Sequence, residues 1–278
     1  MEEAYEVFAL RYADRPGRSR CESFLFDDDH AAAHPIDYFL WVIRNEARTL
    51  VVDTGFDGAE SKRRGRPIFA EPVDCLKDFG IDPASLDTVV ITHLHYDHAG
   101  SLDRFPNATF HLQSDEMAYA TGPCMAHSAL NHPFTAEHVC QMVRKVYSGR
   151  VVFHDGDAQI APGIEVAKIG GHTRGLQAVR VKTRLGWLLL ASDASHFYEN
   201  YLGGKIFPIV VESDVMLEGF KRLPTLASAP GLVIPGHDPL VCDFFPRISG
   251  SADSAATYRL DVEPQRDLVR LLADYGQV

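Results

Sequence analysis

Residues 92–100 constrain the fold and chemistry of this chain more than any other stretch. They read Thr-His-Leu-His-Tyr-Asp-His-Ala-Gly and directly follow the apolar, β-branched run at residues 87–91. The apolar run predicts a buried strand, and the polar residues after it predict a loop at the end of that strand. This loop carries four potential metal ligands: His93, His95, Asp97 and His98.

These residue types indicate a catalytic metal site. Imidazole and carboxylate are good zinc ligands, but one short loop cannot easily wrap four donors around a single tetrahedral ion. Two neighbouring ions that share the loop fit the residues better. The cluster contains no cysteine, whereas structural zinc sites are usually closed and rich in cysteine. A solvated loop that happens to be rich in histidine is the alternative interpretation.

The pattern His93-x-His95-x-Asp97-His98 resembles the signature of the metallo-β-lactamase superfamily. Four further segments resemble the other motifs of that family and occur in its order: Asp53-Thr54-Gly55, Gly171-His172-Thr173, Asp193 and Gly236-His237-Asp238. Each motif alone is weak, but five in the expected order are specific. The resemblance implies an α/β fold, the four-layer αβ/βα sandwich of the family, and we expect one hydrolase domain over residues 1–278.

The resemblance also implies two zinc ions per chain and a division of the ligands between them. The ligands of the first ion are His93, His95 and His172. Those of the second ion are Asp97, His98 and His237. Asp193 bridges the pair, which suits a carboxylate because each of its two oxygens can bind one metal. Asp53 is expected to orient ligands or their loops.

A pair of zinc ions implies hydrolysis. Metals about 3.5 to 4 Å apart can share a water and lower its pKa enough to supply hydroxide near neutral pH. This hydroxide is expected to attack a substrate carbonyl. Asp97 is expected to orient the hydroxide or to carry its proton to the leaving group.

Two details point to a substrate class. The bridging Asp193 and the stretch Tyr38-Phe-Leu-Trp before Asp53 resemble the N-acyl-homoserine lactonase branch, which implies quorum quenching by opening a small-molecule lactone. Classical β-lactamases carry a cysteine in place of Asp193. Thioesterases like glyoxalase II need a helical C-terminal region, for which the chain after His237 leaves little room.

Three alternatives stay open. Another lactone, ester or thioester is one possible substrate. A mononuclear iron dioxygenase of the same fold is a second, although the complete ligand set for a second metal argues against it. A non-catalytic binding protein with an inherited fold is the third, and it would be expected to have lost ligands.

One position departs from the lactonase pattern. Lactonases of this branch carry a tyrosine three residues after the bridging aspartate, where it donates a hydrogen bond to the substrate carbonyl. This chain has His196 at that position and Tyr198 two residues later. An imidazole can also donate, so we predict a catalytic role for His196. A different substrate is one alternative, and a packed or surface histidine is another.

Composition restricts the partners and the cellular location. A formal net charge of -11 opposes binding to nucleic acid, which needs clustered lysine and arginine. No apolar run reaches the roughly 18 to 20 residues that a membrane span requires. The acidic N-terminus does not resemble a secretory signal. Five scattered cysteines without Cys-x-x-Cys spacing indicate reduced thiols, so we expect a cytoplasmic protein.

Hydrophobic patterns predict the remaining elements. Strands are expected at residues 7–12, 36–43, 49–52, 108–112, 151–153, 164–169, 178–182 and 187–191. Helices are expected near residues 70–79, 115–120, 137–147, 215–223 and 264–275. Residues 55–67 predict a flexible rim of the site or an ordinary solvated loop. Residues 122–133 predict a lid or pocket wall, with a plain surface loop as the alternative.

Overall fold

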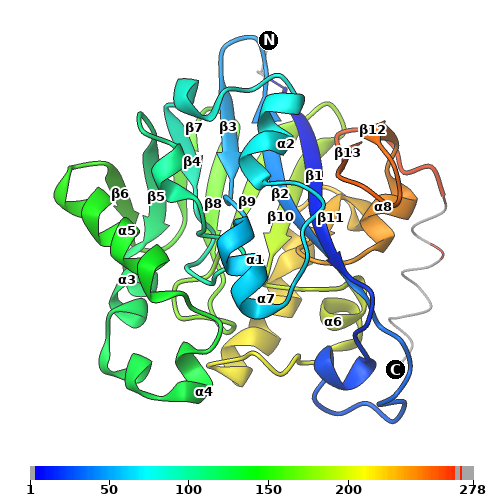
Figure 1. Ribbon diagram of the computed structural model, residues 1–278. Helices are drawn as coiled ribbons and strands as arrows, with labels where there is room; N and C mark the ends of the chain where they lie inside the picture. Colours follow the sequence, from blue (N-terminus) through cyan, green and yellow to red (C-terminus); the bar gives the residue numbers. More distant parts are fainter. Residues whose placement is uncertain (1–3, 267–269, 271–278) are drawn as a thin grey trace.

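Two β-sheets form the centre of the computed structural model, which describes residues 4–266 and residue 270 (Figure 1). The eight-stranded sheet has the order β12-β13-β1-β2-β3-β4-β5-β6, and the five-stranded sheet has the order β11-β10-β9-β8-β7. The strands of the larger sheet are β1 (Glu6–Arg15), β2 (Ile36–Arg44), β3 (Thr49–Val52), β4 (Thr88–Val90), β5 (Thr109–Gln113), β6 (Val151–His154), β12 (Arg247–Gly250) and β13 (Ala256–Arg259). Those of the smaller sheet are β7 (Ala158–Ala161), β8 (Ile164–Lys168), β9 (Gln177–Thr183), β10 (Gly186–Ser192) and β11 (Val233–Pro235).

Helices lie on the outer face of each sheet. Those that pack on the larger sheet include α2 (Pro72–Asp78), α3 (Ser114–Ala120) and α5 (Ala136–Tyr147). Those that pack with the smaller sheet include α6 (Tyr198–Gly203), α7 (Ser213–Leu226) and α8 (Leu240–Phe244). The remaining α-helices are α1 (Gly58–Arg64) and α4 (Ser128–Asn131).

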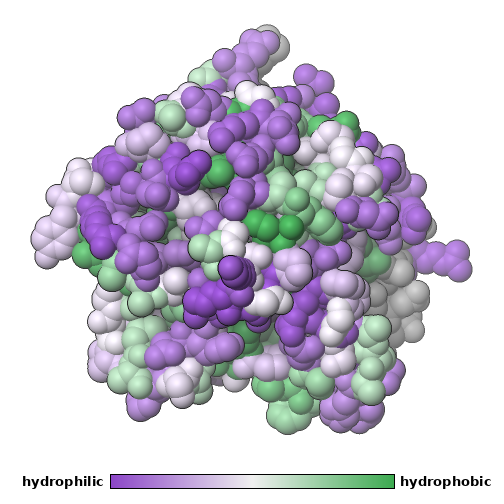
Figure 2. Space-filling model, in the orientation of Figure 1, coloured by the Kyte–Doolittle hydropathy of each residue, from purple (hydrophilic) through white to green (hydrophobic). Residues whose placement is uncertain are grey.

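Alternation along the strands explains why the layers stack. In β2, Trp41 and Ile43 face the core between the two sheets, whereas Leu40 and Val42 face the helices. Because both faces of this strand are covered, its sequence is continuously apolar. The order helix, sheet, sheet, helix confirms the predicted αβ/βα sandwich. The surface seen in Figure 2 is mostly hydrophilic with scattered apolar patches.

The strand directions bring the sequence motifs together. Strands β3, β4, β5 and β6 are parallel neighbours, and β10 runs parallel to β11. The carboxyl ends of parallel strands meet at one edge of a sheet, where ligands commonly bind. Asp53, His93, Asp193 and His237 all follow the ends of such strands.

Most of the expected elements are confirmed, and one expectation is wrong. Residues 55–67 contain helix α1 where a loop or flexible rim was expected. The Asp57 side chain accepts a hydrogen bond from the backbone N–H of Glu60 and so caps the helix start, while Gly65 ends the helix with φ 62°. Strands β7, β12 and β13 were not predicted.

The helix expected at residues 264–275 lies largely outside the described residues. Among the described residues, no helix is long and apolar enough to span a membrane.

Candidate metal centre

The structure brings the seven predicted ligands together at the ends of the strands. The first group, within 4.8 Å of one another, is His93, His95, His172 and Asp193. The second group is Asp97, His98 and His237. All seven side chains are buried. A third group, which shares residues with the first two, consists of Asp193, His196 and His237. The first two groups have the composition of the predicted division into two ion sites.

Asp193 lies between the two groups, with one carboxylate oxygen directed to each. Its Oδ1 is 3.2 Å from His98 Nε2 and 3.1 Å from His237 Nε2. Its Oδ2 is 3.2 Å from His172 Nε2 and 3.7 Å from His93 Nε2. This is the arrangement expected of a carboxylate that bridges two cations.

Asp97 lies on the side of the second group. Its Oδ1 is 3.9 Å from His98 Nε2, and its Oδ2 is 3.8 Å from His237 Nε2. Its backbone carbonyl accepts a hydrogen bond of 3.3 Å from the Tyr12 hydroxyl, which fixes this part of the loop.

Several buried atoms at the centre have no hydrogen-bond partner: His93 Nε2, His98 Nε2, His172 Nε2 and Asp193 Oδ1. A buried polar atom without a partner costs about 1 to 3 kcal/mol of stability. Two cations, one in each group of ligands, would satisfy these four atoms, and histidine with carboxylate is a donor set that zinc prefers. The residues therefore fit a metal ion.

Hydrogen bonds on the outer side orient three of the imidazoles. His98 Nδ1 lies 2.7 Å from Asp53 Oδ2, and His172 Nδ1 lies 2.6 Å from the carbonyl of Ile209. His237 Nδ1 lies 2.8 Å from the carbonyl of Asp37. Acceptors at Nδ1 hold the proton there and leave Nε2 free to bind a metal.

Asp53 also holds the start of the metal loop. Its carboxylate accepts hydrogen bonds from Thr92 N (2.7 Å) and Thr92 Oγ1 (2.8 Å). Its backbone adopts the left-handed conformation with φ 61°, which is uncommon for a residue other than glycine. Strained backbone of this kind often occurs at functional sites. The expectation that Asp53 orients a ligand agrees with its contact with His98.

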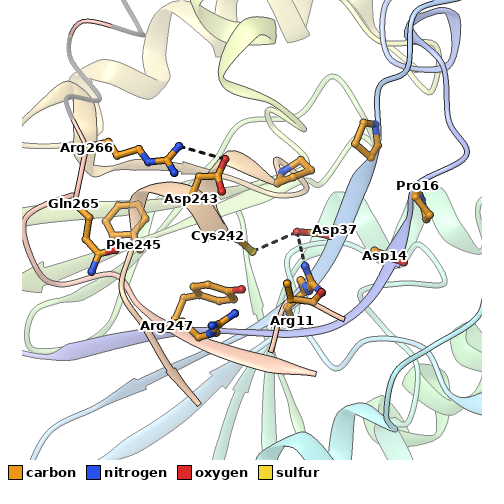
Figure 3. A pocket seen from close by; sticks show the side chains of 14 residues that line it. Arg11, Asp14, Pro16, Asp37, Cys242, Asp243, Phe245, Arg247, Gln265 and Arg266 are labelled. Atoms are coloured by element: carbon orange, nitrogen blue, oxygen red, sulfur yellow. Dashed lines mark hydrogen bonds and ion pairs between the residues drawn. The ribbon is translucent and has the colours of Figure 1, made fainter. Parts of the chain in front are cut away.

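Asp37 connects His237 to a separate surface cavity (Figure 3). In that cavity the Asp37 carboxylate lies 3.5 Å from Arg11 NH1 and accepts a hydrogen bond of 3.3 Å from Cys242 Sγ. The backbone of Asp37 also donates to the His237 carbonyl at 3.0 Å. Asp37 thus contacts His237 through its backbone and lines the cavity with its side chain.

Burial lowers the pKa values of His98 and His237, but nearby carboxylates, first that of Asp193, outweigh it and raise both pKa values above the ordinary value. At His93 and His95, burial dominates. It holds the pKa values of His93 and His95 well below their ordinary range, so both imidazoles are neutral at pH 7. Burial opposes ionisation of Asp193, but the nearby imidazoles, first that of His98, outweigh it and hold the pKa of Asp193 well below its ordinary value. Neutral imidazoles and an ionised carboxylate are the forms that bind a metal.

Glu116 is a site residue that the sequence analysis missed. This fully buried carboxylate accepts hydrogen bonds from Leu94 N (2.8 Å) and Gly175 N (3.1 Å), and so ties the His93 loop to the His172 loop. The approach is close: a Cβ added to Gly175 would lie 2.1 Å from Glu116 N. Within a short helical pattern, nothing marks this glutamate as buried.

His196 lies at the centre, and Tyr198 does not. His196 Nε2 is 2.9 Å from Asp193 Oδ2, and its ring stacks on Phe207 with centroids 3.8 Å apart. The buried Tyr198 ring packs in the core near Phe244. The Tyr198 ring therefore lies away from the ligand groups, whereas His196 contacts the Asp193 carboxylate directly.

The other histidines lie outside the ligand groups. His111 stacks with His154 on strands β5 and β6, and their ring nitrogens are 3.0 Å apart. His34 is half-buried and packs against Phe197. The side chains of three further histidines are exposed: His30, His127 and His132.

Comparison with known proteins agrees with this geometry. Residues 38–237 match the metallo-beta-lactamase superfamily, and the chain belongs to that family. An N-acyl homoserine lactonase of a Bacillus species is 27% identical over 221 residues, which cover 73% of this chain and 82% of the relative. The N-acyl homoserine lactonase AttM of Azorhizobium caulinodans is 29% identical over 199 residues, covering 67% and 72% of the two chains.

Solved structures show the same fold. A quorum-quenching N-acyl homoserine lactone lactonase superposes with a TM-score of 0.73 and 20% identity, covering 92% of this chain and all of the other. AidC, described as a dizinc quorum-quenching lactonase, superposes with a TM-score of 0.64 and 14% identity, covering 90% of this chain and 92% of AidC.

Proposed function

We propose that this protein is a two-zinc hydrolase that opens the ring of N-acyl homoserine lactones. The observation that carries the proposal is the position of Asp193, with one oxygen toward each of two groups of ligands. Its relatives in Bacillus and Azorhizobium support the choice of lactone as the substrate. AidC supports the choice of two zinc ions.

The chain's own residues would divide the chemistry as follows. One ion would be held by His93, His95 and His172. The other ion would be held by Asp97, His98 and His237. Asp193 would be a ligand of both ions. When bound, the two ions would lower the pKa of a water molecule and polarise the lactone carbonyl. Asp97, held at its backbone by Tyr12, would orient the attacking water and pass its proton to the ring oxygen that leaves.

The direct test is pH-stat hydrolysis by the zinc-loaded protein. The panel pairs N-acyl homoserine lactones of several chain lengths with other lactones, a thioester and a β-lactam. We expect selective opening of the acyl-homoserine lactones and loss of activity after removal of zinc by a chelator. Activity confined to another lactone, ester or thioester would contradict the proposed substrate and leave the metal chemistry in place.

We also propose a catalytic role for His196, which the substitution His196→Phe tests. Phenylalanine keeps a ring to stack on Phe207 but removes the nitrogen near Asp193 Oδ2. Loss of a hydrogen-bond donor to the carbonyl oxygen in the transition state typically costs about 100- to 1000-fold, so kcat should fall by about that factor. The control His196→Tyr introduces the tyrosine that lactonases of this branch carry at this position, so its kcat should fall less than that of His196→Phe. An unchanged kcat in His196→Phe would reduce His196 to a packing residue.

The iron dioxygenase alternative has its own measurement. Metal analysis of the protein as purified should give zinc close to two ions per chain, and one iron per chain would favour the dioxygenase. If the zinc-loaded protein hydrolyses no ester, lactone or thioester, that result would favour a non-catalytic binding protein.

Two further expectations are retained as proposals. We propose that residues 1–278 form one hydrolase domain. We propose a cytoplasmic location because all five cysteines are free, as reduced thiols in a reducing compartment would be.

A further inference from the structure

His95 is held differently from the other ligand imidazoles. His98, His172 and His237 each have a hydrogen-bond partner at Nδ1, and His93 Nδ1 lies 3.1 Å from Thr92 Oγ1. Within the described residues, no protein group forms a hydrogen bond with either nitrogen of the His95 ring. Ligand histidines almost always use such a bond to fix the direction of the ring. Ring contacts therefore orient His95, and its ring meets those of His93 and His172 edge to face, with centroids 4.5 Å apart in each pair.

A further ring contact comes from the segment 132–135, which begins at the end of the predicted lid or pocket wall of residues 122–133. The Phe134 ring meets the His95 ring edge to face, with centroids 4.6 Å apart and an angle of 82°. The backbones of His95 and Phe134 form an isolated antiparallel bridge. Next to it, Tyr96 N donates to the carbonyl of Pro133 at 2.8 Å. The segment thus fixes both the backbone and the ring of His95.

Helix α1 in turn holds this segment. Arg64 donates to the carbonyls of His132 (3.1 Å) and Phe134 (3.0 Å) and forms an ion pair with Glu60. Glu60 Oε1 also accepts a hydrogen bond of 2.8 Å from Thr135 Oγ1. The Arg64 guanidinium lies 4.0 Å from the centroid of the Tyr96 ring. One planar guanidinium therefore contacts the helix, the segment and the metal loop.

We infer that three residues position His95 for metal binding: Glu60, Arg64 and Phe134. We call these residues the Arg64 clamp. The side chains of Arg64 and Glu60 are only 8% and 5% exposed. Loss of Arg64 would leave Glu60 paired only with the more exposed Arg63 and would remove both donors to the segment 132–135. Lysine could not replace Arg64, because its ammonium lacks the fork that reaches several acceptors at once.

The clamp assigns a role to two stretches that the sequence left open. The basic run at the end of α1 anchors the segment 132–135. This segment, at the end of the stretch 122–133, forms a wall beside the first ion site. The inference concerns metal binding in the proposed two-zinc centre, and it does not depend on which substrate is hydrolysed.

The test compares Arg64→Met with Arg63→Met in the full-length, zinc-loaded protein. Arg63 also pairs with Glu60, but its side chain is 56% exposed and reaches only the Thr135 hydroxyl, at 3.1 Å. Zinc affinity is measured by competition with a chromophoric chelator, without substrate. We expect Arg64→Met to lower the affinity for one of the two zinc ions by about 10- to 100-fold and to leave the affinity for the other ion unchanged. Arg63→Met should bind both ions like the unaltered protein.

A second variant keeps the test decisive if Arg64→Met does not fold. Phe134→Leu retains an apolar side chain and removes the ring edge against His95, so it should weaken the same ion. In histidine NMR spectra of the zinc-loaded variant, the His95 ring signals should shift while those of His98 and His237 stay in place.

Three results would overturn the clamp. The first is an unchanged zinc affinity in Phe134→Leu. The second is an equal loss of affinity for both ions. The third is a loss of zinc affinity in Arg63→Met as large as that in Arg64→Met. Failure of the two-zinc proposal is distinguishable, because the unaltered protein would then bind fewer than two ions. In that case the clamp is judged on the ion held by His93, His95 and His172.

Discussion

Replacing Asp193 with alanine should abolish hydrolysis and lower the zinc content. The carboxylate is within 3.2 Å of an imidazole nitrogen on each of its two oxygens, so its loss removes a ligand from both ion sites. A metal typically supplies several kcal/mol of charge stabilisation in the transition state. Since 1.36 kcal/mol corresponds to tenfold in rate, a loss of about 4 kcal/mol lowers kcat by about a thousandfold.

Zinc analysis and pH-stat rates on the same sample check this result. The matched control is Asp214→Ala, which removes an exposed carboxylate on α7 and should change neither quantity. Full activity of Asp193→Ala with two zinc ions retained would refute the bridging assignment.

Asp53→Ala should cause a large loss of stability together with weaker zinc binding. The substitution leaves Thr92 N and Thr92 Oγ1 without their buried acceptor and removes the partner of His98 Nδ1. Breaking a buried charged pair costs about 3 to 5 kcal/mol, so the melting temperature should fall clearly. The affinity of the ion held by His98 should fall by about 10- to 100-fold.

The variant Asp53→Asn separates the two effects. Asparagine tolerates the left-handed backbone at φ 61° and can still accept from Thr92 N, so most of the stability should return. Its neutral amide is a weaker partner for His98 Nδ1 than a carboxylate, so zinc affinity should stay low. Thermal denaturation and chelator competition measure the two quantities. Equal recovery of both would contradict a separate orienting role for Asp53.

The ligands of the centre could be predicted because they follow apolar strands. Short motifs such as Gly236-His237-Asp238 come directly after recognisable β-branched runs, and the ends of such strands meet in space. Gly236 shows why the motif needs its glycine: an added Cβ would lie 2.8 Å from Asp193 Oδ1. The sandwich could be predicted from the family resemblance, and continuously apolar strands such as β2 agree with it.

The groups that orient the ligands from outside the metal centre could not be predicted from the sequence. Ile209 and Asp37 act through backbone carbonyls, which every residue type carries. Helix α1 is seven residues long and mostly charged, so periodicity could not reveal it. Strand β12 was missed because all four of its residues are exposed and show no alternation. The role of Arg64 depends on segments about 70 residues apart in sequence, as its bond to Phe134 shows.

The hydrogen bonds that build the centre join residues far apart in sequence. His237 is oriented by a carbonyl 200 positions earlier, and Thr92 after β4 meets Ser192 at the end of β10, 100 positions later, at 2.8 Å. An unfolded chain keeps only the local cluster of residues 93–98 and therefore binds zinc weakly. By linkage, zinc stabilises the folded state in proportion to this difference in affinity. The supply of zinc would thus influence how much of this protein survives proteolysis, as well as how active it is.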